Sequence, residues 1–439
     1  MIKHHFIHLS VVITLGSMPF ASARTSEFSI DRIELKNDIR SLVENGKLPS
    51  LQAAVISRDK IIFSEIFGTG SGRNTMYMIG SIQKVFTATA VMQLYEKKRL
   101  RIDDDVNLYL PFHVRNPRYP DVPVTIGMLL SHRSGLEMFK NQVEWDTRFL
   151  NFRKDGTSGS MPDAAFLSQP DFLKASLDRT GANFDSSVWH FKPGTNYIYS
   201  VSAQYILFCL IEKISGQTYS AYMHENIFKP LEMNNTMFYK DDSTADFAIP
   251  YERKDSINVK LPFWAGERDF ICSTAEDLAR FMIAHMNKGR YKNHQLLEPG
   301  TIALMREKHS PGKDIFHLSS NCPFKGYGLG IIQYSGDCFG HGGSTFGFLS
   351  LWCFNNSQKR GYVILTNING ILYGGDNFNS VWGTVSSVEK AFKTGIGLSR
   401  IDWKIYLIIA CFVVGAFTYI IYFRLKFPYD NRARQKDAA

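Results

Sequence analysis

The chain has 439 residues, of which 44% are hydrophobic and 21% are charged. This is the composition of folded proteins, and it excludes a disordered or collagen-like chain. The formal charge is +9, and residues 424–439 hold +3 of it. The remaining charge is too dilute for a nucleic-acid-binding surface, so we expect no nucleic-acid partner.

The N-terminal residues 1–23 have the features of an export signal. Lys3 is followed by an apolar stretch over 6–15 and by the small residues Ala21-Ser22-Ala23. This order is typical of a secretory signal peptide, so we expect cleavage after Ala23 and export of the chain that follows. An uncleaved anchor is the alternative, but the apolar stretch is short for a membrane span.

Strand patterns lie near both ends of the exported part. Two β-branched runs, 51–57 and 61–68, flank a polar turn and predict an antiparallel hairpin. Late in the chain, four further apolar runs separated by turn residues predict strands at 327–334, 338–343, 348–354 and 362–367.

Between these strands, apolar residues recur with helical spacing. The predicted helices are 81–98, 207–214, 219–228 and 274–286. The last follows Ser273-Thr274-Ala275-Glu276, which predicts a capping box with Ser273 as the N-cap. Residues 137–190 show little periodicity and predict a long surface excursion.

This order of elements predicts an α+β fold. We expect an antiparallel sheet flanked by helices and formed from both ends of the exported chain, with a mainly helical subdomain inserted at about 86–250. The whole domain is expected to cover 24–397.

A second membrane signal lies near the C-terminus. Residues 405–423 are uncharged and apolar, and as a helix they would span ~28 Å, close to the ~30 Å hydrocarbon core. We therefore expect a single C-terminal transmembrane helix, with residues 24–403 outside the cytoplasm and the basic tail 424–439 inside it. A buried core helix is the alternative.

The cysteines and histidines give no metal pattern. Cys272, Cys322, Cys338 and Cys353 would face an oxidising compartment, and the sequence does not distinguish their three possible pairings. No C-x-x-C or H-E-x-x-H pattern occurs, and the 12 histidines are scattered. We expect neither a metal site nor a cofactor.

A serine and a lysine open the predicted helix 81–98. Residues three apart lie on the same face of a helix, so the Lys84 ammonium should lie beside the Ser81 hydroxyl. A serine hydroxyl needs an adjacent base to act as a nucleophile, and a partly desolvated lysine can assist as that base. Alone, S-x-x-K is a weak pattern, because an N-cap serine and a surface lysine also produce it.

Further segments strengthen this pattern. In chain order they are MIGSIQKVFTATAVMQLYEKKRLRIDDDVNLYLP (78–111), VTIGMLLSHRSGL (124–136), FKPGTNYIYSVSAQYILFCLIEKISGQTY (191–219), ENIFKPLEMNNTMF (225–238), STAEDLARFM (273–282) and GHGGSTFGFLSLWCF (340–354). With them, the chain resembles the serine β-lactamase/penicillin-binding-protein-like family, in its class C β-lactamase-related branch. That branch also holds D-Ala-D-Ala carboxypeptidases, D-aminopeptidases and esterases.

The resemblance implies roles for individual residues. Ser81 would be the acylated nucleophile, and Lys84 and Tyr199 would share the transfer of its proton. The backbone N–H groups of Ser81 and Ser344 would form the oxyanion hole. His341-Gly342-Gly343 would line the substrate site from a strand, with Val201 on another side. His132 is expected to be a structural turn residue.

Two positions depart from the family pattern. Val201 stands where the second motif has asparagine, and His341 stands where β-lactamases have lysine. Both changes favour a peptidase or an esterase over an efficient β-lactamase.

The predicted function is that of a membrane-tethered, exported serine hydrolase. It would act through an acyl-enzyme on the amide or ester bond of a small-molecule or peptide substrate. The alternatives are a carboxylesterase for small or lipid-like esters and a non-catalytic binder of cell-wall peptide.

Overall fold

The computed structural model describes residues 32–137, 169–239, 245–261, 270–310 and 324–370, and four residue pairs between 376 and 388. The predicted signal peptide 1–23, membrane span 405–423, tail 424–439 and Cys322 lie outside these residues. Within the described part of the chain, no helix is both long and apolar enough to cross a membrane.

Seven antiparallel strands form the central sheet, in the order β10-β11-β12-β13-β14-β1-β2. Their bounds are β1 Ser50–Ser57, β2 Lys60–Gly68, β10 Phe324–Tyr327, β11 Ile332–Tyr334, β12 Cys338–Thr345, β13 Phe348–Asn355 and β14 Arg360–Thr366. β1 pairs with β14, with Leu51 opposite Thr366. The two ends of the domain therefore build one sheet, which confirms the predicted antiparallel α+β fold.

Short strands form three smaller sheets, in the orders β3-β7-β4, β15-β5-β6 and β8-β9. Their bounds are β3 Tyr77–Met78, β4 Met237–Phe238, β5 Tyr251–Lys254, β6 Ile257–Lys260, β7 Ile271–Ser273, β8 Arg290–Tyr291, β9 His294–Gln295 and β15 Ile368–Asn369.

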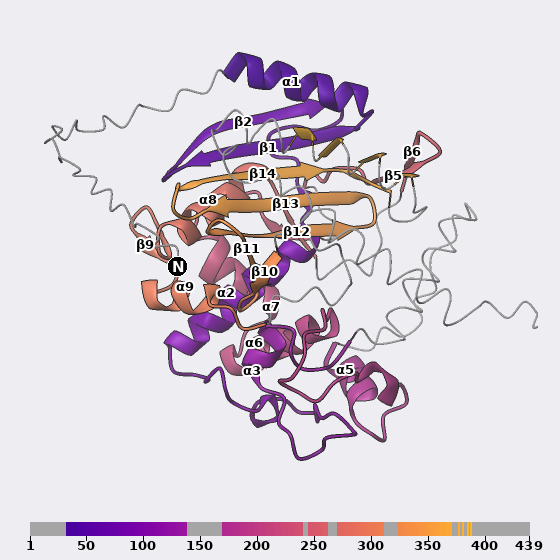
Figure 1. Ribbon diagram of the computed structural model, residues 1–439, viewed down its shortest axis with the longest axis vertical. Helices are drawn as coiled ribbons and strands as arrows, with labels where there is room; N and C mark the ends of the chain where they lie inside the picture. Colours follow the sequence, from indigo (N-terminus) through magenta and orange to yellow (C-terminus); the bar gives the residue numbers. More distant parts are fainter. Residues whose placement is uncertain are drawn as a thin grey trace, which may run out of the picture.

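The described helices flank the central sheet. They are α1 Arg32–Asn45, α2 Gln83–Glu96, α3 Ile126–Leu130, α5 Gln169–Leu177, α6 Ser202–Ser215, α7 Tyr219–Met223, α8 Ala275–Met286 and α9 Pro299–Arg306. Four single turns accompany them: the 3₁₀ turns η1 Gly80–Ile82, η2 Val106–Leu108 and η3 Ser186–Val188, and the π-helical turn η4 His224–Phe228. Figure 1 shows α1 above the sheet and α2, α3, α6 and α7 gathered below it.

The sheet separates two apolar cores, because successive side chains of a strand point to opposite faces. Ala53 and Val55 of β1 pack in the core that contains α1, whereas Ala54 and Ile56 pack in the larger core with α2, α6 and α8. In the larger core, the rings of Phe86 on α2 and Phe281 on α8 stack at 3.9 Å between centroids. α2 is thereby fixed against a helix that covers the sheet.

Two predicted elements differ in the structure. The single strand 327–334 is two strands, β10 and β11, because Gly330 has a φ of 74° and the chain turns there. The surface excursion 137–190 contains α5 and η3, while residues 138–168 lie outside the described part. α5 has nine residues, which is too short a segment for its helical spacing to stand out in the sequence.

The predicted N-cap of α8 is also wrong by one residue. Ser273 is the last residue of β7 and pairs with Tyr77, and its hydroxyl lies 2.7 Å from that of Thr236. Thr274 is the N-cap instead, and its hydroxyl accepts a hydrogen bond from the backbone N–H of Asp277. Since Ser273 is engaged in a strand, the next hydroxyl residue caps the helix.

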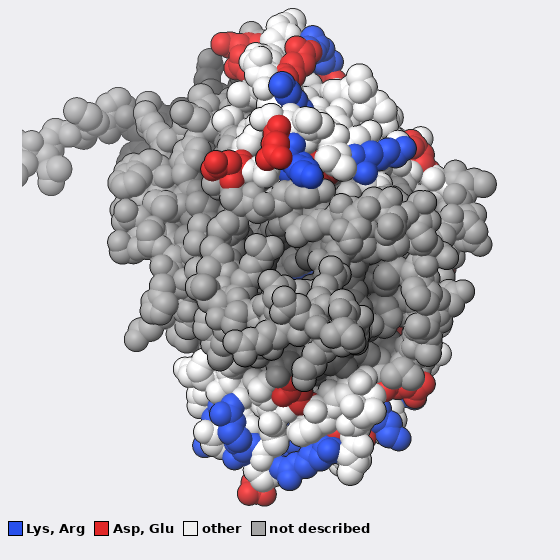
Figure 2. All heavy atoms as spheres, turned by 90° about the vertical axis from the view of Figure 1, so that its right-hand side faces the viewer, with Lys and Arg blue, Asp and Glu red and all other residues white. Residues whose placement is uncertain are grey.

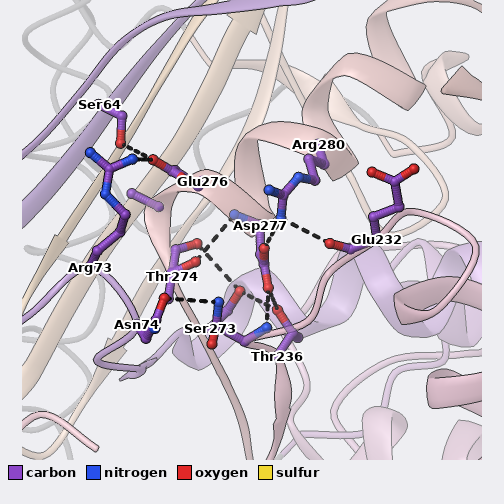
Figure 3. Close-up of polar contacts among 12 residues, drawn as sticks. Ser64, Arg73, Asn74, Glu232, Thr236, Ser273, Thr274, Glu276, Asp277 and Arg280 are labelled. Carbon is purple, nitrogen blue, oxygen red and sulfur yellow. Dashed lines mark hydrogen bonds and ion pairs between the residues drawn. The ribbon is translucent and has the colours of Figure 1, made fainter. Parts of the chain in front are cut away.

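A polar network surrounds this end of α8 (Figure 3). The buried Asp277 carboxylate accepts from the Asn235 backbone N–H at 2.8 Å, from the Thr236 hydroxyl at 2.9 Å and from Arg280. Burial raises the pKa of Asp277 from its usual value. Glu276 accepts from Ser64 of β2, so the network ties β2, the 235–236 loop and α8 together. Through Thr236 and Ser273 the network also reaches β7. β7 pairs with β3, which ends three residues before the predicted nucleophile Ser81.

Charged side chains of both signs lie at the upper and lower ends of the face drawn in Figure 2. On this face the described lysine and arginine residues are mixed with aspartate and glutamate. Exposed pairs of this kind contribute at most about 1 kcal/mol each to stability, so the buried apolar cores dominate the free energy of folding.

Candidate active site

The predicted nucleophile lies on a tight turn that leads into α2. Ser81 is the middle residue of η1, and α2 begins two residues later at Gln83. Gly80 has a φ of 51°, which a residue with a Cβ adopts only with strain. The Gln83 side chain accepts from the backbone N–H of Ile271 at 3.1 Å. This hydrogen bond anchors the turn and the helix to the residue that opens β7. Ser81 itself is only half buried.

The structure brings Ser81, Lys84 and Tyr199 together. Lys84 Nζ donates a hydrogen bond to Ser81 Oγ at 3.1 Å, as the three-residue spacing predicts. The same ammonium lies 4.8 Å from the centroid of the Tyr199 ring. Lys84 is 7% exposed, so its charge acts on its neighbours with little screening by water.

Strand β12 approaches the Ser81 turn through residues without bulky side chains. A Cβ at Gly343 would lie 1.9 Å from the carbonyl oxygen of Ile79, so only glycine fits there. A Cβ at Gly80 would lie 2.8 Å from the backbone nitrogen of Ser344. Opposite Gly343 on β13, the Ser350 hydroxyl donates to the Ile79 carbonyl at 2.9 Å. The backbone of Ser344 therefore lies beside the turn that carries Ser81.

The other predicted residues of β12 have different environments. Gly342 is half buried, whereas the His341 side chain is 1% exposed. His341 Nδ1 lies 2.6 Å from the Gly342 carbonyl oxygen, and Nε2 lies 3.0 Å from the Tyr327 hydroxyl. A carbonyl only accepts, so Nδ1 carries the proton and Nε2 accepts from Tyr327.

Burial, together with the charge of Lys84, lowers the pKa of His341 to about 3. The imidazole is therefore neutral near pH 7, and it offers no fixed positive charge to a substrate carboxylate. The predicted substrate contact of His341 stays a prediction.

Val201 lies at the start of α6, two residues after Tyr199. It occupies the N-cap position of the helix but has no side-chain atom that could cap it. The preceding Ser200 does this instead, since its hydroxyl accepts from the backbone N–H of Ala203 at 3.0 Å. Val201 is half buried. Its side chain is aliphatic, whereas the family pattern has the amide of asparagine at this position.

Sequence reasoning missed the aromatic surroundings of Tyr199. The His132 ring lies 4.4 Å from the Tyr199 ring and 4.7 Å from the Tyr327 ring, between centroids. Tyr197 lies on another side of His132, at 5.7 Å. The only signal in the sequence was the position of His132 before Ser134-Gly135, which indicated a turn. The structure shows that this turn reaches the candidate site.

This arrangement has the parts that acyl transfer requires. A hydroxyl is hydrogen-bonded to a buried ammonium, the ring of a tyrosine lies next to that ammonium, and the backbone of β12 approaches the turn that carries the hydroxyl. Nucleophile, proton acceptor and backbone donors can thus act on one carbonyl group. In the described residues, no group of three or more histidine, cysteine or acidic side chains could hold a metal ion.

Comparison with known proteins gives the same fold. The family model named Beta-lactamase matches residues 35–377. "Protein flp" of Staphylococcus aureus (strain N315) is 23% identical over 358 residues, which are 78% of this chain and 64% of flp. The chain thus covers less than two thirds of that relative. "Putative penicillin-binding protein PbpX" of Bacillus subtilis (strain 168) is 25% identical, over 79% of this chain and 78% of PbpX.

A solved structure agrees with these relatives. The octameric penicillin-binding protein homologue from Pyrococcus abyssi aligns with a TM-score of 0.63 and 25% identity, over 77% of this chain and 74% of that one. The fold, together with the serine–lysine pair at the start of α2, defines a protein of the β-lactamase and penicillin-binding-protein type. The chain belongs to the Beta-lactamase family, whose model covers most of its length.

Proposed function

We propose that this protein is a serine hydrolase that forms an acyl-enzyme on Ser81 from a substrate with an amide or ester bond. The observation that carries the proposal is the 3.1 Å hydrogen bond from Lys84 Nζ to Ser81 Oγ, beside Tyr199 and the backbone of Ser344. A structural serine needs no buried ammonium at its hydroxyl, whereas a nucleophilic serine needs a group that takes its proton.

The proposed reaction has two steps. Ser81 Oγ attacks the acyl carbonyl carbon while its proton passes to the Lys84–Tyr199 pair, which takes part in this step in the form that lacks one proton and so has room for it. Backbone N–H groups of Ser81 and Ser344 stabilise the oxyanion. The bond to the leaving group breaks, and the leaving group takes the proton from the pair. Water then attacks the acyl-enzyme by the same route in reverse, which releases the acid and restores the Ser81 hydroxyl.

A fluorophosphonate probe tests the proposal directly. Ser81 Oγ would attack the phosphorus and displace fluoride, and peptide mass spectrometry would locate the adduct. We expect one adduct, on the peptide that contains Ser81. A protein that takes no label, or takes it on another residue, would contradict the serine-hydrolase proposal and would favour the non-catalytic binder.

Two observations favour esters and uncharged substrates within this class. Val201 cannot exchange hydrogen bonds with a substrate amide, and the buried His341 is neutral and bonded to Tyr327. A site built to bond an amide discriminates strongly, whereas an apolar contact contributes only about 1–3 kcal/mol. We therefore propose a carboxylesterase as the more specific function.

Replacing Val201 with asparagine is expected to shift selectivity toward amides by about tenfold. The new amide would restore one hydrogen bond to a substrate amide, worth about 1.4 kcal/mol in the transition state. The measurement is kcat/KM for one ester and one amide with the same acyl group, in both proteins. Val201→Ala is the control, since it enlarges the site without adding a hydrogen bond. If the wild type hydrolyses both substrates equally fast, position 201 does not determine selectivity.

We also propose that the hydrolase domain is exported and tethered to the cell membrane as a single-pass protein. The signal-like residues 1–23 and the apolar stretch 405–423 support this topology. Truncation after Gly397 is expected to release the domain from the membrane fraction, with its fluorophosphonate labelling unchanged. A truncated protein that still sediments with membranes after loss of residues 1–23 would exclude the single-anchor arrangement.

A further inference from the structure

His132 holds the chain on both sides of Tyr199. Its carbonyl oxygen accepts from the backbone N–H of Ile198 at 2.8 Å. Its side-chain Nδ1 accepts from the backbone N–H of Ser200 at 3.1 Å. The residues before and after Tyr199 are therefore both hydrogen-bonded to one histidine, which lies 67 positions earlier in the chain.

The backbone of His132 is shaped for this contact. His132 has a φ of 57°, in the left-handed region that few residues other than glycine adopt and in which histidine is one of the more frequent types. In this conformation the carbonyl and the imidazole both bond to the same segment of chain, 198–200. The two hydrogen bonds to the segment 198–200 hold this backbone conformation in place.

The ring of His132 packs against the ring of Tyr199. The two rings lie 4.4 Å apart between centroids and are inclined by 38°. Lys84 Nζ also lies close to Tyr199, 4.8 Å from the ring centroid. The Tyr199 ring is thus in contact both with this histidine and with the lysine that donates to Ser81.

His132 is itself neutral and enclosed. Since Nδ1 accepts from a backbone N–H, the proton is on Nε2, and Nε2 has no hydrogen-bond partner among the described residues. Burial, followed by the charges of Lys84 and His341, holds the pKa of His132 well below its usual value. The other titratable groups against its ring are Tyr197, Tyr199 and Tyr327.

We propose that His132 is the positioning residue of Tyr199, which it fixes beside Lys84 for proton transfer from Ser81. It acts through the tyrosine and touches neither substrate nor the reacting atoms. This inference rests on the proposed function, because it assigns a task to the Lys84–Tyr199 pair. A misplacement of about 1 Å in such a pair can reduce the rate about 10²-fold.

Two polar replacements separate positioning from mere support of the fold. Asparagine tolerates the left-handed backbone and places its Oδ1 near the position of Nδ1, so His132→Asn keeps an acceptor for the Ser200 N–H. Glutamine is closer in size but puts its oxygen elsewhere. The matched control is His285→Ala, which removes another buried imidazole, one that lies against Thr89 in the core.

The experiment measures kcat and KM for p-nitrophenyl acetate across pH, together with thermal unfolding, in the full chain. We expect His132→Asn to stay within tenfold of the wild type. We expect His132→Gln to lose about 10²-fold in kcat with little change in KM and with a shifted pH profile. His285→Ala should lose stability but keep the wild-type pH profile. If the glutamine variant does not fold, His132→Ala takes its place in the comparison.

Equal activity and equal pH profiles in the asparagine and glutamine variants would overturn the inference. So would a loss of activity that only follows the loss of folded protein, as in the control. Fluorophosphonate labelling of the wild type distinguishes this failure from that of the proposed function: a wild type labelled at Ser81 leaves the function intact, whereas an unlabelled wild type removes both.

Discussion

Replacing Ser81 with alanine is expected to abolish hydrolysis and fluorophosphonate labelling. Loss of the nucleophile in a serine hydrolase lowers kcat by about 10⁶-fold, which leaves only the rate due to binding and the oxyanion hole. The fold should survive, because the half-buried Ser81 side chain accepts a hydrogen bond from Lys84 and its loss costs about 1 kcal/mol. Labelling and turnover of p-nitrophenyl acetate measure the effect.

Ser344→Ala is the matched control for this experiment. It removes a hydroxyl at the same site but keeps the backbone N–H that is predicted to bind the oxyanion. The Ser344 hydroxyl accepts from Asn369 at 2.9 Å, so this variant also loses one hydrogen bond. We expect it to retain labelling. Persistent labelling of Ser81→Ala would assign the nucleophile to another residue.

Replacing Lys84 with methionine is expected to reduce the rate of Ser81 acylation by about 10²–10⁴-fold, the usual contribution of a general base. Methionine keeps the apolar stem that packs in the 7% exposed position and removes the ammonium that donates to Ser81. The rate of fluorophosphonate labelling, followed by stopped reaction and gel fluorescence, measures the loss. Lys97→Met on the exposed end of α2 is the control. Equal labelling rates in the wild type and Lys84→Met would show that Ser81 is activated by another group.

The parts of the fold and site that follow local rules could be predicted from the sequence. The hairpin of β1 and β2 follows from two β-branched runs around a polar turn, and β12 to β14 follow from similar runs. The approach of Lys84 to Ser81 follows from a spacing of three in a helical segment. In each case the interacting residues are neighbours in the chain, so local geometry determines the contact.

The parts that depend on distant contacts could not be predicted. His132 contacts Tyr199 only because the turn before Ser134 meets the start of α6. The neutral state of His341 depends on its burial and on the charge of Lys84, which belongs to a helix more than two hundred positions earlier in the chain. The N-cap of α8 is Thr274 and not the predicted Ser273, because Ser273 pairs with Tyr77, almost two hundred positions away. These tertiary contacts cannot be predicted from residue type and spacing alone.

The pairing of β1 with β14 has a consequence for how the chain acquires its structure. Ile56 cannot meet its partner Gly361 until about 300 further residues exist. At a synthesis rate of about 5–20 residues per second, roughly 15–60 s pass between the synthesis of β1 and that of β14, the strand that joins β1 and β2 to the rest of the sheet. Non-local strand pairing is also intrinsically slow. Until then β1 and β2 can form only an isolated hairpin, which is at best marginally stable in water.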